Sequence, residues 1–366
     1  MEKVKKIVRG VKRMKIILTG GGTAGHVVPN LALVPGLLAE GFEIEYIGGK
    51  GGMEQALVED AGLNFHGIST GKLRRYFSLK NFTDGFRVIK GVNDARKLLK
   101  KFKPDVIFSK GGFVAVPVVY AAKMAKIPVI LHESDITVGL ANRLAIPHAH
   151  KICHVFPETL AHLPKSKAVH TGTPLRREIL EGSAIAGTAL CNFAAEKPVI
   201  MVMGGSSGAA SVNSVLRQSL EQLTADFNIL HICGKGNMDA SLESGGYRQF
   251  EYVRQGMGDL YALSKLIVSR AGANSLAEIA ALNKPNILIP LPLGSSRGDQ
   301  ILNAQSFEKQ GFSVVLDDKN LTPTKLVEAI YSTFEKRGAY RAAMSQVQAA
   351  KDGTAQIIQL IKETIK

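Results

Sequence analysis

The chain has 366 residues, 45% of them hydrophobic, and a net charge of +15 from 46 lysines and arginines against 31 aspartates and glutamates. Its length allows two domains with separate cores, and no apolar run approaches the roughly 20 residues that a membrane-spanning helix needs. The three widely spaced cysteines lack the spacing of a metal site or a disulfide framework, so we expect core residues in a reducing cytoplasm.

The positive charge is concentrated in residues 3–15 and in the block that starts at residue 72. Over residues 72–90, basic side chains are interleaved with aromatic and aliphatic ones, a pattern that lets a segment lie on an anionic bilayer. A solvated helix face over an ordinary core is the alternative. The chain shows no zinc finger or RNA-recognition signature and no tryptophan for base stacking. We therefore expect the 72–90 block to contact an anionic membrane surface, and we expect no nucleic acid partner.

Strand and helix patterns alternate from residue 15 onward. The first strand covers residues 15–19, a glycine loop follows over 20–26, and a helix is predicted for 27–40. Further apolar runs predict strands at 44–48, 64–68, 106–108, 128–131, 151–154 and 168–170. Helical patterns cover 53–61, 94–101 and 116–125.

The alternation restarts at residue 199. A strand at 199–203, a loop of glycine and serine at 204–208 and a helix at 209–223 repeat the opening pattern. Later strands are predicted at 228–233, 250–253, 266–268, 286–289 and 313–316. Two such series favour two doubly wound domains with parallel sheets, whose ligands bind beyond the carboxyl ends of the strands. The segment 172–196 loses strand periodicity and is the predicted boundary.

The stretch 269–279 has the features of a nucleotide site. It follows the apolar run 266–268 and opens into a helix that places Leu276, Ile279 and Ala280 on one face. Backbone N–H groups at such a helix N-terminus attract phosphate. The carboxylate of Glu278 could accept hydrogen bonds from the hydroxyls of a ribose. The alternative is a capped helix whose Glu278 faces solvent.

Seven motifs, in order along the chain, resemble those of the MurG family. They are GGGTAGH at 20–26, SKGGF at 109–113, HESD at 132–135, GTPLR at 172–176, GGSSGA at 204–209, SRAGANSLAE at 269–278 and RGDQILNA at 297–304. This family transfers N-acetylglucosamine (GlcNAc) from UDP-GlcNAc to lipid-linked muramyl pentapeptide, converting lipid I to lipid II in bacterial peptidoglycan synthesis. Through the cell wall it serves cell shape, cell division and the cell cycle. The resemblance runs from residue 15 into the last predicted helix.

The resemblance implies an α/β protein with the GT-B fold, in which two Rossmann-like domains, each a doubly wound parallel sheet, face each other across a cleft. Residues 1–174 would form the acceptor and membrane-facing domain, and residues 175–340 the UDP-GlcNAc-binding domain. Residues 341–366 would form a helix that crosses back to the first domain. The family implies a peripheral protein on the cytoplasmic face of the cell membrane.

The resemblance assigns a set of residues to UDP-GlcNAc. They are Thr23, Asp135, Arg176, Ser206, Ser207, Tyr252, Val253, Ala271, Gly272, Ala273, Glu278, Asp299 and Gln300. Glu278 would bind the ribose hydroxyls, while Ser206 and Ser207 would hold the diphosphate. The helix N-terminus at 271–273 would stabilise the leaving UDP. Arg176 would lie near the nucleotide, unless it forms an interdomain salt bridge.

The remaining donor residues would recognise the base and the sugar. Tyr252 and Val253 match positions that flank the uracil, unless they are ordinary residues at a strand end. Asp299 and Gln300 resemble the polar pair that contacts the GlcNAc hydroxyls, and Asp135 would contact the donor sugar. The family often has glutamine or histidine where Asp299 stands and asparagine where Asp135 stands.

The acceptor side requires a general base that removes a proton from the muramyl hydroxyl. His26 fits because it follows the first glycine loop and because imidazole titrates in the required range. Glu133 is the alternative base. Either could be structural instead, His26 as a hydrogen-bonding loop residue and Glu133 as the anchor of the 132–142 loop. Glycine amides would hold the acceptor diphosphate, and these glycines are Gly20, Gly21, Gly22, Gly25, Gly111 and Gly112.

The sequence has no Asp-x-Asp motif and no histidines at zinc spacing. We therefore expect no metal and no other cofactor, with UDP-GlcNAc as a substrate. Helix dipoles, loop amides and Arg176 would stabilise the leaving group. Direct displacement at an α-linked donor would give an inverted, β-linked product.

Other classes of protein share parts of this pattern. A nicotinamide-dependent oxidoreductase would usually carry an acidic residue near the end of the second strand, where residues 47–50 offer none and only Glu45 is close. A basic membrane scaffold without catalysis would leave Glu278 and Gln300 unexplained. The nearest alternative is a non-hydrolysing UDP-GlcNAc epimerase, which shares the fold and the donor but would not need the 72–90 block.

Overall fold

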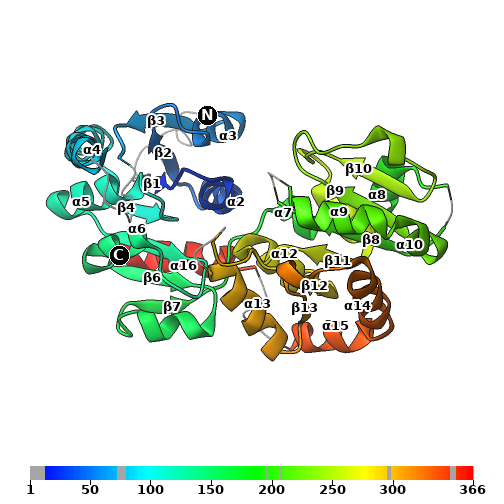
Figure 1. Ribbon diagram of the computed structural model, residues 1–366. Coiled ribbons are helices and arrows are strands. Elements are labelled where there is room, and N and C mark those ends of the chain that lie inside the picture. The colour runs from blue at the N-terminus through cyan, green and yellow to red at the C-terminus, as the bar shows by residue number, and fades with distance from the viewer. Residues whose placement is uncertain are drawn as a thin grey trace, which may run out of the picture. The chain divides into compact units, whose positions relative to one another are not determined.

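A parallel β-sheet forms the centre of each of the two units into which the chain divides (Figure 1). The computed structural model describes residues 13–71, 80–194, 196–205, 208–294, 298–346 and 352–365, with the backbone alone for 80–85. Unit 1 comprises Met1–Glu133, Thr137–Pro174 and Gly353–Lys366. Unit 2 comprises Ser134–Ile136 and Leu175–Asp352. The chain therefore leaves unit 1 after Pro174 and returns to it at Gly353.

The sheet of unit 1 has seven strands in the order β3-β2-β1-β4-β5-β6-β7, and each neighbouring pair is parallel. The strands are β1 Lys15–Thr19, β2 Glu43–Gly49, β3 Asn64–Ile68, β4 Val106–Ser109, β5 Val129–Glu133, β6 Lys151–His154 and β7 Ala168–His170. The central strands β1, β4 and β5 consist mainly of apolar residues because helices cover both faces of the sheet. The strand order reverses between β1 and β4, which is where ligands bind in such sheets.

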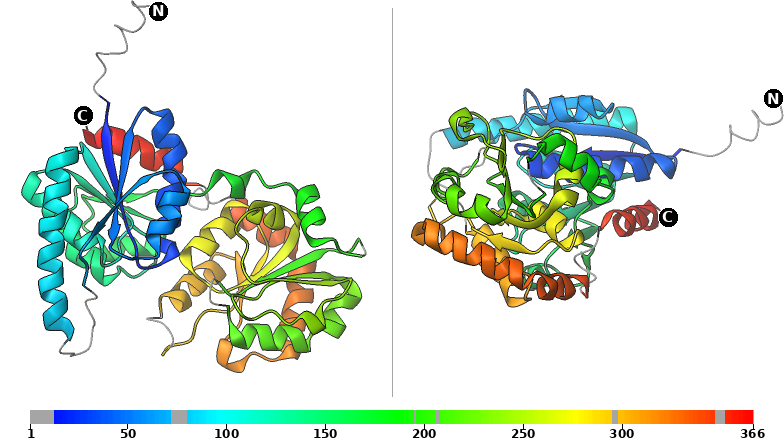
Figure 2. Two further views of the ribbon diagram at one scale, coloured as in Figure 1. Left: turned by 90° about the horizontal axis from the view of Figure 1, so that it is seen from above. Right: turned by 90° about the vertical axis from the view of Figure 1, so that its right-hand side faces the viewer.

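Helices of unit 1 cover both faces of this sheet (Figure 2). The helices are α2 Ala24–Ala39, α3 Glu54–Asp60, α4 Lys80–Phe102, α5 Ala115–Ala125, α6 Leu140–Ala145 and α16 Thr354–Ile365. One core lies under α4 and α5 and includes Leu99 and Val118. The other lies under α2 and α16 and includes Leu37 and Ile361. The last helix of the chain therefore contributes to the core of the unit that contains the first strand.

The sheet of unit 2 has six parallel strands in the order β10-β9-β8-β11-β12-β13. They are β8 Val199–Met203, β9 Asn228–Ile232, β10 Tyr247–Phe250, β11 Ser264–Ser269, β12 Asn286–Leu288 and β13 Ser313–Val315. The helices are α7 Arg177–Leu180, α8 Ala184–Cys191, α9 Ala210–Gln218, α10 Leu220–Asp226, α11 Met257–Leu263, α12 Ala273–Ala281, α13 Asp299–Lys309, α14 Pro323–Glu335 and α15 Arg337–Ser345.

Two cores flank the sheet of unit 2 as well. On one face, Leu216 of α9 packs in the same cluster as Ile330 of α14. On the other face, Leu260 of α11 packs in the same cluster as Ile279 of α12. Leu276, Ile279 and Ala280 are all buried, so the helix face predicted for the 269–279 stretch is confirmed. This packing fixes the N-terminus of α12 at the carboxyl end of β11.

Some predicted elements differ from those in the structure. The helix predicted for 209–223 is interrupted at Ser219, whose Oγ donates to the carbonyl oxygen of Val215 and competes with the helical pattern. The strand predicted for 250–253 ends at Phe250 and begins at Tyr247, because buried and partly buried side chains alternate there on an edge strand. The predicted boundary segment 172–196 contains the short helices α7 and α8.

The basic block is described only in part, because residues 72–79 lie outside the described chain. In the part that follows, Phe86 is 76% exposed and Ile89 is 62% exposed on α4, and the basic residues Arg87 and Lys90 are exposed beside them. Within the described ranges, every helix is too short or too polar to cross a bilayer.

Candidate active site

The first glycine loop of unit 1 connects β1 to α2 and holds His26 in the first turn of that helix. The Nδ1 atom of His26 lies 3.1 Å from the carbonyl oxygen of Gly21 and 3.1 Å from Oγ1 of Thr23. Because a carbonyl oxygen only accepts hydrogen bonds, we assign the proton to Nδ1 and the lone pair of the neutral ring to Nε2. A general base that acts through Nε2 needs this tautomer. Thr23, expected at the donor, contacts this histidine.

The second glycine loop follows β4 and touches the first. Gly111 and Gly112 have φ of +86° and +81°, a backbone conformation that favours glycine. A Cβ added at Gly112 would lie 2.4 Å from the carbonyl oxygen of Gly21, so the two loops are in backbone contact. A Cβ added at Gly20 would lie 3.2 Å from Cβ of Lys110, so Gly20 also lies against the residue that precedes Gly111. Most of the glycines expected to bind the acceptor diphosphate therefore gather at the switch point of unit 1.

A buried carboxylate that the sequence reading missed lies under the first loop. Glu54, at the start of α3, is 2% exposed. Its Oε1 accepts from the backbone N–H of Gly49 at 2.8 Å, and its Oε2 accepts from that of Gly22 at 3.2 Å. The N–H of Gly22, one of those expected to hold the acceptor diphosphate, is therefore bonded to Glu54. The glycine-rich run that ends at Gly52 was the available signal, since glycine leaves room for a carboxylate beside the backbone.

The HESD motif is built into the carboxyl end of β5. Glu133 is buried, and its Oε2 accepts from the N–H of Gly139 at 3.0 Å and from Nδ2 of Asn142 at 2.9 Å. These are the hydrogen bonds of a loop anchor. His132 accepts from Nζ of buried Lys110 at 2.8 Å through Nδ1, and Nε2 donates to the carbonyl oxygen of Gly172 at 2.9 Å. Burial, and then Lys110, hold the pKa of His132 well below its usual range, so its ring is neutral.

Glu278, the carboxylate predicted to bind the ribose, lies between Tyr261 and Arg176 in unit 2. Glu278 stands in the second turn of α12, and its Oε2 accepts from the hydroxyl of Tyr261 at 2.9 Å. Nη2 of Arg176 lies 3.9 Å from Oε1 of Glu278, and Nη1 lies 2.6 Å from Glu178. Burial raises the pKa of Glu278, while Arg176 and the Tyr261 hydrogen bond act in the opposite direction. Arg176 and Glu278 were both expected at the donor, Arg176 through the resemblance alone, whereas Tyr261 was missed.

A second group of predicted donor residues meets at the N-terminus of α12. Gly272 is the N-cap and has no capping side chain. Asn303 of α13 donates through Nδ2 to the carbonyl oxygen of Ala271 at 3.3 Å and to Oδ1 of Asp135 at 3.0 Å. Its Oδ1 accepts from the N–H of Ile136 at 3.3 Å. Within unit 2, Asn303 thus holds Asp135 beside the helix end that was expected to stabilise UDP.

Two further residues of α13 complete this region. Asp299 is the first residue of the helix and is buried. Gln300 accepts from the N–H of Leu291 at 3.1 Å through Oε1, which orients its amide group. Asp299 and Asn303 are four residues apart and therefore lie on the same face of α13, and all three residues belong to its first two turns.

The structure places the uracil candidates in the loop after β10. Tyr252 is 57% exposed, and Val253 packs against the core cluster that contains Ile279 of α12. Ser206 and Ser207, expected at the diphosphate, lie outside the described residues.

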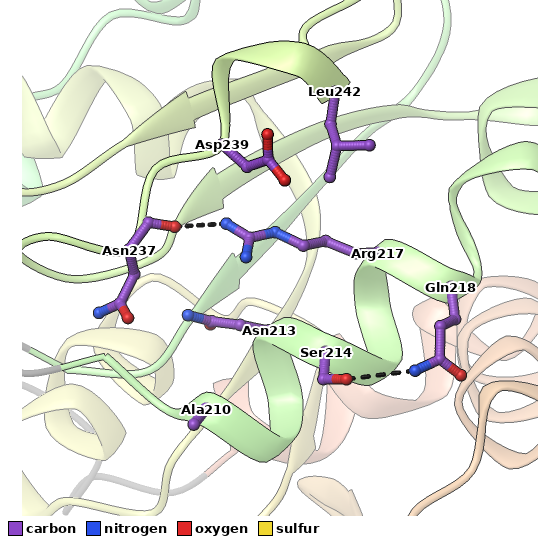
Figure 3. Close-up of a pocket in the computed structure, with 8 residues that line it drawn as sticks. All are labelled: Ala210, Asn213, Ser214, Arg217, Gln218, Asn237, Asp239 and Leu242. Atoms are coloured by element: carbon purple, nitrogen blue, oxygen red, sulfur yellow. Dashed lines mark hydrogen bonds between the residues drawn. The ribbon is translucent and has the colours of Figure 1, made fainter.

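A cavity of about 460 Å³ opens beside α9 in unit 2 (Figure 3). Its lining is Ala210, Asn213, Ser214, Arg217, Gln218, Asn237, Asp239 and Leu242, and none of these is a predicted site residue. Arg217 donates to the carbonyl oxygen of Asn237 and to Gln249. His231 behind it bonds Asn213, and burial lowers the pKa of this histidine to about 3. These hydrogen bonds connect α9 to β9 and β10, so we assign them a structural role.

Comparisons with known proteins agree with this arrangement. The model of the glycosyltransferase family 28 N-terminal domain matches residues 16–154, and that of the C-terminal domain matches residues 199–361. A UDP-N-acetylglucosamine–N-acetylmuramyl-(pentapeptide) pyrophosphoryl-undecaprenol N-acetylglucosamine transferase of Clostridium botulinum (strain 657, Type Ba4) is 53% identical over 96% of this chain and 99% of that protein. The protein of the same name from Lachnospira eligens is also 53% identical, with the same coverage of both chains.

Solved structures show the same fold. The crystal structure of Acinetobacter baumannii MurG is 26% identical, with a TM-score of 0.75, and the match covers 96% of this chain and 99% of that one. The UDP-GlcNAc 2-epimerase from Neisseria meningitidis, bound to UDP-GlcNAc, is 13% identical with a TM-score of 0.67, and covers 96% of this chain and 99% of that one. This second likeness concerns the fold alone. With both domain models matched and half of all residues shared with curated relatives over nearly the full length, the chain is a glycosyltransferase that belongs to the MurG family and has its GT-B fold.

Proposed function

We propose that this protein transfers GlcNAc from UDP-GlcNAc to the muramyl hydroxyl of undecaprenyl-pyrophosphoryl-MurNAc-pentapeptide, which converts lipid I to lipid II. The observation that carries the proposal is the 53% identity over 96% of the chain to relatives named for this transfer. The arrangement of unit 2 supports it, since an open helix N-terminus and a confined carboxylate lie on the same short helix, α12.

The donor site in this proposal is organised around α12. Its N-terminus at Gly272 and Ala273 would stabilise the departing UDP, with Ser206 and Ser207 holding the diphosphate. Glu278 would accept hydrogen bonds from the ribose hydroxyls, and Arg176 beside it would add positive charge. The leaving group would then be stabilised without a metal ion or another cofactor.

The remaining donor contacts follow the same proposal. Tyr252 and Val253 would flank the uracil. Asp299 and Gln300 would contact the GlcNAc hydroxyls from α13, and Asp135 would join them through its hydrogen bond with Asn303.

On the acceptor side, His26 would remove the proton from the muramyl hydroxyl as that oxygen attacks the anomeric carbon. Its hydrogen bond to Gly21 supports this role, because it leaves the lone pair of the ring on Nε2. Glu133 is the weaker candidate, since Gly139 and Asn142 both donate to its Oε2. The paired glycine loops would hold the acceptor diphosphate, and a single displacement would invert the anomeric carbon.

We further propose that the protein acts as a peripheral protein on the cytoplasmic face of the cell membrane. The exposed apolar residues Phe86 and Ile89 on α4, with Arg87 and Lys90 beside them, support contact with an anionic bilayer.

The test is incubation of the purified protein with radiolabelled UDP-GlcNAc and a lipid-linked muramyl acceptor. We expect label to move to the lipid fraction, and we expect Glu278→Gln to raise the KM for UDP-GlcNAc. Conversion of UDP-GlcNAc to UDP-ManNAc without transfer would instead support the epimerase alternative. Failure of both reactions would refute the proposed activity.

A further inference from the structure

One peptide group lies between a histidine and a buried carboxylate in unit 1. The carbonyl oxygen of Gly21 is 3.1 Å from Nδ1 of His26. The N–H of Gly22 is 3.2 Å from Oε2 of Glu54, measured from the nitrogen. The C=O of Gly21 and the N–H of Gly22 belong to the same peptide bond. The order of groups is therefore His26 Nδ1–H, peptide C=O, peptide N–H, Glu54 carboxylate.

The carboxylate of Glu54 is held by the backbone on both of its oxygens. It is 2% exposed, and each of its oxygens accepts a backbone hydrogen bond, from Gly49 and from Gly22. A Cβ added at Gly21 would lie 2.3 Å from Oε1, so only glycine allows the acid to approach the loop this closely. Both the acid and the glycines beside it are therefore needed for this contact.

A carboxylate that accepts a hydrogen bond from a peptide N–H also affects the carbonyl oxygen of the same peptide group. The peptide bond is delocalised, so negative charge at the N–H end increases the electron density on the carbonyl oxygen. Hydrogen bonds in such a chain strengthen one another. The carbonyl oxygen of Gly21 then holds Nδ1–H of His26 more firmly, and the imidazolium ring is favoured over the neutral ring. An aspartate that bonds a histidine directly has the same two effects in hydrolases.

We infer that Glu54 is a positioning residue that acts on His26 through the Gly21–Gly22 peptide, fixing the Nδ1–H tautomer and making Nε2 more basic. The effect on the ring is independent of the reaction. Its consequence for transfer rests on the proposed role of His26 as the base.

Two other titratable residues described near this loop, Tyr46 and Lys110, make different contacts. The hydroxyl of Tyr46 donates to the carbonyl oxygen of Gly20 at 2.7 Å, and burial raises the pKa of that phenol, so it is neutral. Lys110 packs against Gly20, and its ammonium contacts His132. Among these groups, Glu54 is the one whose side chain bonds the N–H of Gly22.

The direct test is a pH titration of the whole protein labelled with ¹⁵N in its histidine side chains. The resonances of His26 are assigned by their loss in His26→Gln. We expect the Nδ1–H tautomer in the wild type, and in Glu54→Gln a titration midpoint lower by about one pH unit, the usual range of environmental shifts for histidine. Glu59→Gln removes an equal charge from the exposed side of the same helix and should leave the midpoint unchanged. An unchanged midpoint and tautomer in Glu54→Gln would overturn the inference.

A second measurement uses the wild type and does not depend on the folding of a variant. If the peptide connects the two side chains, the amide resonance of Gly22 should titrate with the same midpoint as the His26 ring. The amide of Gly49, which bonds the other oxygen of Glu54, should respond less. A Gly22 amide that does not follow His26 would contradict the inference.

Kinetics separate this inference from the proposed function. If His26 is the base, the acidic limb of kcat/KM for the acceptor should move to lower pH in Glu54→Gln, by the same amount as the ring. We expect kcat to fall and the KM for UDP-GlcNAc to stay unchanged. A shifted ring with an unshifted acidic limb would support the peptide coupling and remove His26 as the base.

Discussion

The proposed recognition of a ribose by Glu278 would use a charged carboxylate, whereas burial of that side chain disfavours the charge. Burial raises the pKa of Glu278, and the nearby Arg176 and the Tyr261 hydroxyl only partly offset it. As the pH falls through this raised pKa, the carboxylate takes up a proton and loses an acceptor. We therefore predict that UDP affinity weakens on acidification at a pH above the ordinary range of glutamates. Calorimetric titration with UDP between pH 8 and pH 5 measures this.

Two variants separate the effect of the Glu278 carboxyl on the pH dependence from the titration of the UDP phosphates themselves. Glu278→Gln should bind UDP roughly 10- to 100-fold more weakly at neutral pH, the cost of losing charge-assisted hydrogen bonds. It should also lack the part of the pH dependence that belongs to the carboxyl. Glu308→Gln, an exposed change on α13, should match the wild type. Identical pH profiles for the wild type and Glu278→Gln would show that this acid does not contact the nucleotide.

A candidate site residue can be recognised from the sequence when it belongs to a local pattern. It cannot be recognised when its role depends on a contact with a residue far away in the chain. Glu278 could be singled out because it follows a glycine turn on a short amphipathic helix. Its partner Tyr261 is 17 residues away, and Glu54 is 32 residues from the Gly22 amide that it binds. Such pairs form only when the sheet aligns the ends of its strands. The acid under the first glycine loop therefore could not be recognised before the fold was known.

The two glycine loops of unit 1 act as one element because their backbones touch. A methyl group at Gly112 would meet the carbonyl oxygen of Gly21, and the residue also has φ of +81°. We predict that Gly112→Ala displaces the first loop, and with it His26, and lowers kcat/KM for the lipid acceptor at least 10-fold. UDP binding in unit 2 should not change. Steady-state kinetics with each substrate varied in turn measures both effects.

The Gly112→Ala substitution combines two effects, backbone strain from the positive φ and the steric contact with Gly21, and a second variant separates them. Gly41 has the same φ of +81°, ends α2, and has open space where a Cβ would stand. Gly41→Ala should therefore cost about 1 kcal/mol of stability, as alanine does in a left-handed conformation, and leave acceptor kinetics intact. If both variants lose acceptor activity equally, strain rather than the loop contact is responsible.

Helix α4 provides a second prediction at the scale of an element. Phe86 and Ile89 are exposed next to Arg87 and Lys90, so apolar insertion and headgroup attraction would act together. The paired change of Phe86 and Ile89 to serine should reduce binding to vesicles that contain phosphatidylglycerol at least 10-fold, since each large apolar side chain contributes about 1.5–3 kcal/mol on full burial. Co-sedimentation at low and moderate salt measures this.

The control for α4 is an equally exposed apolar residue elsewhere. Ile185 of α8 is 85% exposed in unit 2, and Ile185→Ser should leave vesicle binding unchanged. Binding should also weaken as salt rises, because screening reduces the attraction between basic residues and anionic lipid. Equal binding to neutral phosphatidylcholine vesicles would contradict a role for the basic residues.

For the whole molecule, the alternation of strands and helices was enough to predict two parallel sheets, because a parallel neighbour requires a crossover that a helix usually supplies. The order of strands was not predictable from periodicity. In unit 1 the chain runs outward from β1 to β3 and then returns to place β4 beside β1. That choice depends on which helix faces match, and amphipathic patterns alone do not rank those matches. The motifs of the resemblance supplied the architecture instead.

The return of the last helix to unit 1 makes the stability of that unit depend on the end of the chain. Ile357, Ile358 and Ile361 of α16 are buried in the core under α2, and Ile358 lies against Gly36. Truncating a buried isoleucine costs about 2–5 kcal/mol through lost burial and the cavity that remains. We therefore predict that Ile361→Ala lowers the unfolding temperature of unit 1, whereas Gln359→Ala on the exposed side of α16 does not.

Ligand binding can identify which unit has been weakened, because a ligand stabilises only the folded unit that binds it. If UDP binds unit 2, it should raise one calorimetric transition and leave the other in place. Ile361→Ala should lower the transition that UDP does not raise. Since α16 belongs to unit 1 while α15, which precedes it, belongs to unit 2, a loss of the UDP-sensitive transition would mean that the two units unfold together. In that case the last helix stabilises unit 2 as well as unit 1.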